Sequence, residues 1–265
     1  MRIWIWWAFL PFVGYGQTDW TSPVQPTGIA SYRTSVSDPF AASDMHAALA
    51  FIDSNRIGLS IQNKYTLKGL STCSLVGQLR TSNGGWGFQF GMMGNEVFNG
   101  FQLSAGYGIQ LSKSIGLGVG AAAQKNQITG VVPVYTLFPQ VGLVYSLSKN
   151  INIGFHIKKL FQSTLKSTMM YKEIISIKTG IGCQIDDHFY IAAEISNGYR
   201  QKSEITMYAE WMSNKSIKSF LMYQNSNASM LGGIQYRIRK SNVGMGVSYH
   251  NYLGNAFYLM MYHAF

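Results

Sequence analysis

The stretch NGFQLSAGYGIQLSKSIGLGVGAAA, from Asn99 to Ala123, contains two runs of alternating residues joined by a short polar turn. The apolar members are Phe101, Leu103, Ala105, Tyr107, Ile109 and Leu111 in the first run, and Ile115, Leu117, Val119, Ala121 and Ala123 in the second. Because successive side chains of a strand point to opposite faces, each run forms a strand with one apolar face. The stretch is therefore predicted to be a β-hairpin with its turn at Ser112–Ser114.

The same alternation recurs from residue 55 to the C-terminus and predicts about 14 strands. They are centred on residues 57–61, 68–81, 86–90, 101–111, 115–123, 141–147, 151–157, 175–183, 189–195, 205–211, 216–224, 234–238, 243–249 and 256–265. Every second connection is short and polar, at 81–84, 112–114, 148–150, 186–188, 213–215 and 240–242. The longest connections lie around 126–136 and 160–170. Short turns at one rim and longer loops at the other are typical of outer-membrane barrels, in which the short turns are periplasmic.

The composition favours a membrane barrel over a soluble β protein. Hydrophobic residues make up 47% of the chain and charged residues only 12%, which is about half the usual share. No run after residue 16 approaches the ~20 apolar residues of a spanning helix. A soluble β-sandwich or lipocalin-like protein would carry a more charged surface. We expect an all-β fold: a single transmembrane antiparallel β-barrel of about 14 strands, with an N-terminal plug-like segment and an outward apolar face.

Residues 1–16 are predicted to be a signal peptide. Arg2 supplies the positive region, Ile3–Val13 the apolar region, and Gly14-Tyr15-Gly16 a cleavage site of small residues. The alternative is a short membrane anchor, although about 11 apolar residues are too few to span a bilayer. The signal predicts export to the bacterial outer membrane.

Residues 17–54 do not alternate, and residues 55–265 form the predicted barrel. The Ala-rich part from Asp38 to Phe51 is expected to contain a short helix capped by Ser43 or Asp44. Residues 17–54 are interpreted as a plug inside the barrel, with a periplasmic tail as the alternative. The face formed by Gly116, Gly118 and Gly120 predicts a bare gap on the inner wall, which the plug would fill.

Charged residues on the inward faces are the candidate lumen groups. They are Lys158, Lys178, Glu194, Glu204, Glu210, Arg237 and Arg239. One interpretation is an ionic lining that selects solutes or fixes the plug, and the other is a set of salt bridges that hold the barrel together. The last strand, with Phe257, Leu259, Met261 and the terminal Phe265, is typical of the signal read by the barrel assembly machinery. The alternative interpretation is that this segment is one more strand and carries no assembly signal.

No catalytic motif is present, so no enzymatic activity and no cofactor are expected. The five histidines show no metal-ligand spacing. Cys73 and Cys183 lie within alternating runs and are interpreted as small apolar side chains, although a disulfide stays open. The net charge of +10 is scattered, which argues against nucleic acid and favours contact with outer-membrane lipid and lipopolysaccharide, or a solvated basic rim.

Residues 35–123 resemble a family of Bacteroidota outer-membrane proteins related to PorV/PorQ of the type IX secretion system, which is itself similar to the long-chain fatty-acid transporter barrels. The matching features are Val36-Ser37-Asp38-Pro39-Phe40, Ala47-Ala48-Leu49-Ala50, Ile57-Gly58-Leu59, Asn63-Lys64-Tyr65, Leu67-Lys68, Trp86-Gly87-Phe88, Tyr107-Gly108 and the hairpin Leu111–Gly118. The resemblance implies a 14-stranded barrel with an N-terminal insert.

Two functions are compatible with these observations. The first is a channel or transporter for small solutes, including hydrophobic ones, of the PorV/PorQ or fatty-acid-transporter type. The alternative is a non-transporting accessory or structural protein that binds secretion-system or surface proteins. An outer-membrane hydrolase would need a supported Ser or His at one rim, and the sequence offers no such group.

Overall fold

The computed structural model describes residues 28–64, 71–95, 97–159, 163–165, 175–198, 203–225 and 228–265. The predicted signal peptide, and residues 17–27 of the predicted plug, lie outside the described residues. The strands are β1 (Arg56–Asn63), β2 (Ser71–Thr81), β3 (Gly84–Gly94), β4 (Phe98–Ser112), β5 (Ile115–Ile128), β6 (Val134–Ser146), β7 (Ile151–Lys158), β8 (Ser163–Leu165), β9 (Ser176–Gln184), β10 (Phe189–Gly198), β11 (Glu204–Met212), β12 (Ile217–Gln224), β13 (Ser229–Ile238), β14 (Ser241–His250) and β15 (Gly254–Ala264).

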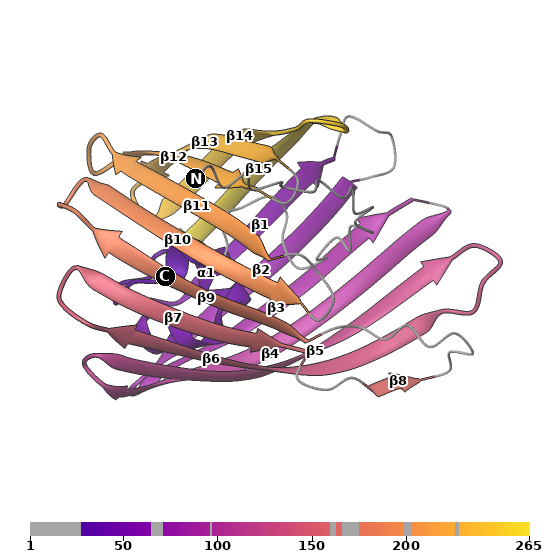
Figure 1. The fold of residues 1–265 in the computed structure, drawn as a ribbon, viewed down its shortest axis with the longest axis horizontal. Coiled ribbons are helices and arrows are strands. Elements are labelled where there is room, and N and C mark those ends of the chain that lie inside the picture. Colours follow the sequence, from indigo (N-terminus) through magenta and orange to yellow (C-terminus); the bar gives the residue numbers. More distant parts are fainter. Residues whose placement is uncertain are drawn as a thin grey trace, which may run out of the picture.

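Fourteen of these strands close into one antiparallel barrel (Figure 1). Each pairs with its neighbours in chain order, β7 pairs directly with β9, and β15 returns to β1. The three-residue β8 pairs with β6 outside this ring. Closure pairs the backbone groups that an open sheet would leave exposed to lipid. The predicted fold class is confirmed.

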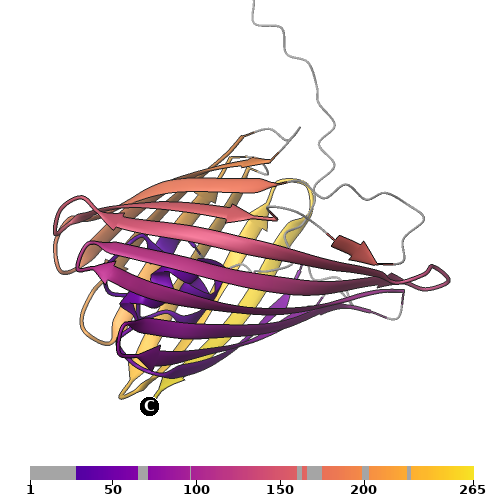
Figure 2. The ribbon, with the colours of Figure 1, turned by 90° about the horizontal axis from the view of Figure 1, so that it is seen from below.

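The short connections gather at one end of the barrel, here called the short-turn rim (Figure 2). One expected loop is much shorter than its sequence suggests. β5 continues to Ile128 and β6 begins at Val134, so only residues 129–133 connect them instead of 126–136. Gln124, Lys125 and Asn126 interrupt the apolar alternation, but the backbone ladder with β6 continues through them. Of the other long connection, only 163–165 belongs to the described residues.

The opening hairpin turns its apolar residues outward, as predicted. Leu103 is 59% exposed and Val119 is 58% exposed, whereas the intervening Gln102 is only 5% exposed. The same holds for the last strand, where Phe257, Leu259 and Met261 are about half exposed and Tyr258 is buried. An apolar outer face and a polar or bare inner face are what a barrel in lipid requires. None of the helices in the described residues is long and apolar enough to cross a membrane.

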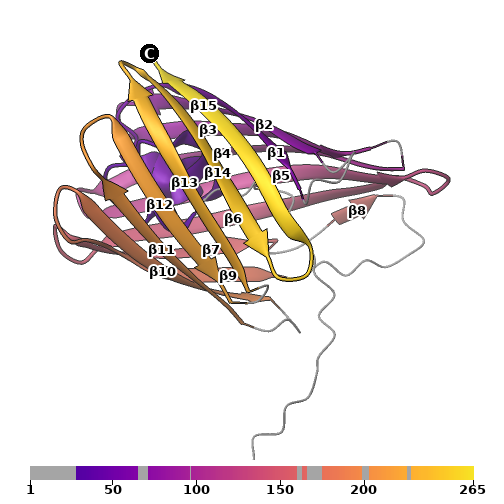
Figure 3. The same cartoon turned by 90° about the horizontal axis from the view of Figure 1, so that it is seen from above.

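The N-terminal segment lies inside the barrel toward the short-turn rim (Figures 2 and 3). It forms η1 (Ile29–Ser31), α1 (Pro39–Asp44) and η2 (His46–Phe51). All residues of these three helices are buried. We call residues 28–52 the plug segment.

The start of α1 differs from the sequence-based expectation. Asp38 is the N-cap, and its carboxylate accepts a hydrogen bond from the Phe40 N–H at 2.9 Å. Ser43 and Asp44, the expected caps, lie in the last turn of the helix instead. Pro39 at the first helical position explains the earlier start, because its fixed φ suits that position and its missing N–H is not needed there.

Candidate functional site

The glycines of β5 form the seat for helix η2. A side chain at Gly116 would meet Phe51 and Ala50, one at Gly118 would meet the backbone of His46 and Ala47, and one at Gly120 would meet the His46 ring. The bare inner wall predicted from the sequence is therefore where η2 packs. The seat also includes glycines on neighbouring strands, which face the same helix or its flank: Gly85, Gly87, Gly106, Gly108 and Gly142.

Register explains why these glycines form one surface. Gly118 pairs with Gly108 on β4 and with Gly142 on β6, while Gly120 pairs with Gly106. Because paired residues lie side by side on the same face of a sheet, these glycines form a continuous patch without side chains. This lets the backbone of η2 lie directly on the wall, an approach that any Cβ would prevent.

A second seat holds Tyr32 against β7 and β9. Its ring packs where Gly154 and Gly180 leave space. Its hydroxyl donates a hydrogen bond to Glu194 on β10 at 2.5 Å. Burial, and then the Glu194 carboxylate, raise the pKa of Tyr32 well above its usual range, so the phenol stays protonated and remains a donor. The Tyr190 hydroxyl donates to the carbonyl oxygens of Ile29 and Tyr32 at 3.2 and 3.1 Å, which fixes the backbone of the plug segment.

A buried ionic cluster, cluster A, joins α1 to β7, β9 and β10, the strands that follow the first seat around the barrel. Asp44 forms an ion pair with Lys158 on β7. Lys178 on β9 lies 4.0 Å from Asp44 and 3.4 Å from Glu194. Burial would raise the pKa of Asp44, but Lys158 and Lys178 outweigh it and hold the pKa well below its usual value. The Asp44 carboxylate is therefore ionised at neutral pH.

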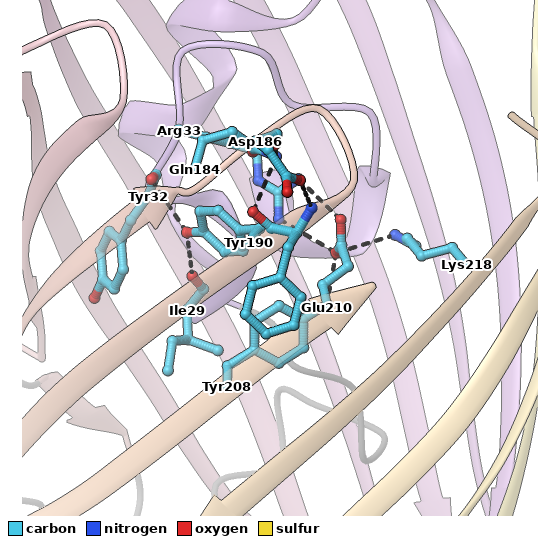
Figure 4. A network of polar contacts seen from close by, with 10 residues as sticks. Ile29, Tyr32, Arg33, Gln184, Asp186, Tyr190, Tyr208, Glu210 and Lys218 are labelled. Carbon is cyan, nitrogen blue, oxygen red and sulfur yellow. Dashed lines mark hydrogen bonds and ion pairs between the residues drawn. The ribbon is translucent and has the colours of Figure 1, made fainter. Parts of the chain in front are cut away.

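A second cluster, cluster B, holds Arg33 (Figure 4). Its guanidinium contacts both carboxylate oxygens of Glu210, at 3.1 and 3.2 Å, and lies 3.8 Å from the centre of the Tyr190 ring. The Tyr208 hydroxyl donates to Glu210 at 2.7 Å, and the Lys218 ammonium lies 3.5 Å from the same carboxylate. Burial would lower the pKa of Arg33, but Glu210 raises it above its ordinary value. This bidentate pair fixes the orientation of the first part of the plug segment.

The predicted lumen charges fall into two groups. Four of them belong to clusters A and B, where they bind the plug segment: Lys158, Lys178, Glu194 and Glu210. Glu204 is only partly buried and accepts a hydrogen bond from the Gln224 amide. Arg237 is exposed near the end of β13, on the same face as the buried Gln235, and Arg239 is exposed in the turn after β13 with φ of 55°. Alternation alone could not show that β13 ends at Ile238.

Sequence reasoning missed the residues of the plug segment that bind the wall. Tyr32 and Arg33 lie in a stretch without periodicity, so nothing marked them as partners of inward acids. The sequence predicts Asp44 only as a helix cap and does not indicate its ion pair. The available signal was the imbalance of buried charge: inward carboxylates and amines need partners, and the plug segment carried several candidates.

Four aromatic rings on the inner wall form a continuous row next to the plug segment, here called the aromatic row. Tyr190 and Tyr208 have their ring centres 6.0 Å apart, Tyr208 and Phe220 6.2 Å, and Phe220 and Tyr258 6.3 Å. All four rings are buried. The row runs over β10, β11, β12 and β15, and its rings form one apolar core with residues of the plug segment.

His46 is a buried histidine of the plug segment. Burial, and then the Lys158 ammonium, lower its pKa to about 4, against the opposing effect of Asp44. His156 on β7 is its aromatic neighbour, with ring centres 6.5 Å apart. In the described part of the chain, no group of three or more His, Cys, Asp or Glu side chains could hold a metal ion.

We predict that the plug segment loosens between about pH 6.5 and pH 4. An undocked His46 binds its proton near pH 6.5, whereas the docked ring resists protonation until about pH 4. Stability therefore falls as pH falls through this window, by on the order of 3 kcal/mol, and levels off below it. Thermal unfolding at a series of pH values measures the effect. A His46→Phe variant should show a weaker pH dependence in this window, and an unchanged profile in the variant would contradict the assignment.

This chain resembles known proteins in its structure. No protein-family model and no curated protein matches the chain. The toluene transporter TbuX of Ralstonia pickettii is similar with a TM-score of 0.65 and 11% identity, covering 86% of this chain and 94% of that one. A FadL homologue of Pseudomonas aeruginosa has a TM-score of 0.62 and 11% identity, covering 91% and 97%. The toluene transporter TodX of Pseudomonas putida has a TM-score of 0.60 and 10% identity, covering 89% and 96%. These identities are low, so the likeness shows the fold, which is that of bacterial outer-membrane barrels.

Proposed function

We propose that the protein is an outer-membrane channel for small hydrophobic solutes, and that it works without catalytic chemistry. The observation that carries this proposal is the aromatic row, which lies on the inner wall of a closed barrel beside the plug segment. An apolar solute that leaves water gains free energy by contact with such rings. Barrels of similar fold include proteins described as toluene transporters, which supports the same substrate class.

The architecture is also compatible with a channel whose water path is blocked. The plug segment closes the short-turn half of the lumen, and buried ion pairs hold it in place. A wide aqueous pore would let ions through, whereas a plugged lumen blocks their water path, and an apolar solute reaches the buried rings of the aromatic row only as the plug segment shifts. We therefore expect slow passage of sugars and ions and faster passage of toluene-sized molecules.

Uptake of radiolabelled toluene tests the proposal. Cells lacking their own hydrophobic-solute channels would express the full chain, and initial uptake of toluene and sucrose would be compared with that of cells without it. Phe220→Ala should lower toluene uptake up to roughly tenfold, because it removes a ring contact of ~0.5–1.5 kcal/mol that the solute would make with the middle of the row. Leu221→Ala, on the outward face of the same strand, is the matched control. Toluene uptake no faster than in cells without the chain would overturn the proposal.

A second candidate is the accessory role suggested by the resemblance to PorV/PorQ. The tight contact of η2 with the glycine seat favours it, because a plug that never moves leaves the barrel as a platform for other proteins. Crosslinking in native membranes, followed by isolation of the barrel, tests this role. Recovery of secretion-system or surface proteins would support it, and recovery of the barrel alone would count against it.

A further inference from the structure

Gly91 marks a recess on the inner wall that the plug segment leaves empty. The residue lies on the inward face of β3, between Gln89 and Met93. A Cβ at Gly91 would meet no other atom of the described chain within 4 Å. The other inward glycines of β3, Gly85 and Gly87, instead face Ile52 and Leu49 of the plug segment. The recess therefore lies beyond the plug, in the half of the lumen away from the short-turn rim.

The surroundings of the recess follow from strand register. Gly91 pairs with Ser74 on β2 and with Gln102 on β4, so these two side chains flank it directly (the strands are adjacent in Figure 1). The remaining inward neighbours, along β3 and diagonally on β2 and β4, are Gln89, Met93, Thr72, Val76, Gly100 and Ser104. None of these eight neighbours is charged, whereas clusters A and B place the buried charges of the plug contacts on β7, β9, β10, β11 and β12.

Two buried polar atoms beside the recess have no hydrogen-bond partner among the described residues. They are Thr72 Oγ1 and Gln102 Oε1, on side chains that are 3% and 5% exposed. A buried polar atom without a partner costs free energy, so such atoms are normally satisfied by water or by a ligand. The Gln89 amide, by contrast, donates to Ser74 Oγ at 3.4 Å.

A cavity also lies at one end of the neighbouring strands. It has a volume of about 480 Å³ at the ends of β2, β3 and β4, and Thr72 and Met93 line it. Its other walls include the outward apolar side chains Ile61, Met92 and Phe101.

We propose that the Gly91 recess binds a small uncharged solute that carries a hydroxyl group, which refines the substrate class and rests on the proposed function. The hydroxyl donates to Gln102 Oε1 and hydrogen-bonds with Thr72 Oγ1, while the apolar part packs against Met93. A carboxylate fits poorly, because the eight neighbours provide no charge to balance it once water is removed. The recess thus selects an alcohol or phenol over an acid of the same size.

Benzyl alcohol, toluene and benzoate are matched probes, because they share a ring and differ in one group. Equilibrium binding to the purified full chain at pH 7, and initial uptake by expressing cells, would be measured for each probe. We expect benzyl alcohol to bind roughly five- to tenfold tighter than toluene, as one or two net hydrogen bonds predict, and benzoate to bind most weakly. Benzoate binding best, or all three binding equally, would overturn the proposal.

Two sets of variants locate the site. Gly91→Val fills the recess and should remove the preference for benzyl alcohol, as should the near-isosteric Thr72→Val. Gly77→Val is the control, because Gly77 also has open space around its Cβ position but lies on the outward face of β2. A preference that survives both recess variants would contradict the site.

The two proposals fail differently. If no probe enters cells faster than in cells without the chain, but purified protein still binds benzyl alcohol in a Gly91-dependent way, the transport function fails and the recess stands. If toluene uptake is normal but the alcohol preference is absent, the recess fails and the transport function stands. Unchanged heat-modifiable migration of Gly91→Val would establish that the variant is folded.

Discussion

Gly118→Leu is expected to expel η2 from its seat and open the lumen. A Cβ at Gly118 would overlap the Ala47 nitrogen and the His46 carbonyl carbon, which are backbone atoms that cannot swing aside. Overpacking of a well-packed site costs ~1–3 kcal/mol, and more where the neighbour is rigid. The wall is a closed ladder of hydrogen bonds, so the plug segment should give way first. Planar-bilayer conductance should rise at least roughly tenfold, and Arg33 should become accessible to trypsin.

Variants at two further glycines are the controls for this prediction. At Gly142 the added Cβ would lie 3.3 Å from the Ala47 side chain, so Gly142→Ala should change conductance little. Gly77→Leu places the same bulk on the outward face, where the Cβ meets no atom of the described chain within 4 Å. Low conductance and full trypsin protection in Gly118→Leu would show that η2 does not depend on this seat.

The barrel was predictable from sequence because one physical requirement repeats in every strand. An outward residue meets lipid and an inward residue meets the lumen, so alternation marks nearly every strand, as Leu103 and Gln102 illustrate. Closure followed from the cost of unpaired backbone in lipid. The end of a strand is set by pairing with its neighbours instead, which is why β5 and β6 extend beyond their apolar pattern and why Arg239 falls in a turn.

The contacts of the plug segment were far less predictable. The bare face of β5 is visible as Gly116, Gly118 and Gly120, but its extension across β3, β4 and β6 depends on register, which a single sequence does not reveal. Likewise, the wall acids were visible, but their partner Arg33 comes from a stretch without a pattern, 177 residues from Glu210. Pairs between residues so far apart in the sequence form only in the folded structure, so the local sequence pattern does not indicate them.

Replacing Asp44 by Leu is expected to cost about 3–5 kcal/mol of plug docking, the range found when one partner of a buried ion pair is removed. Lys158 and Asp44 are 3% and 4% exposed, so the variant would leave the Lys158 ammonium buried without its carboxylate. The double variant Asp44→Leu/Lys158→Met should recover most of the loss, because well-packed apolar residues often replace a buried pair at little cost. Lys178 keeps Glu194 as its partner in both variants. Thermal unfolding in detergent, together with trypsin protection of the plug segment, measures the change.

Two further measurements separate the effect of Asp44 from a general loss of negative charge. One is stability at low pH, and the other is a variant of a second carboxylate, Glu204. Because the Asp44 pKa lies below its usual value, its stabilising effect is fully present above about pH 4 and is lost only as pH falls further, below the window of His46. Glu204→Gln should change stability by less than ~1 kcal/mol, since Glu204 is only partly buried and the amide can still bond to Gln224. Equal losses in Asp44→Leu and in the double variant would show that Lys158 does not act through Asp44.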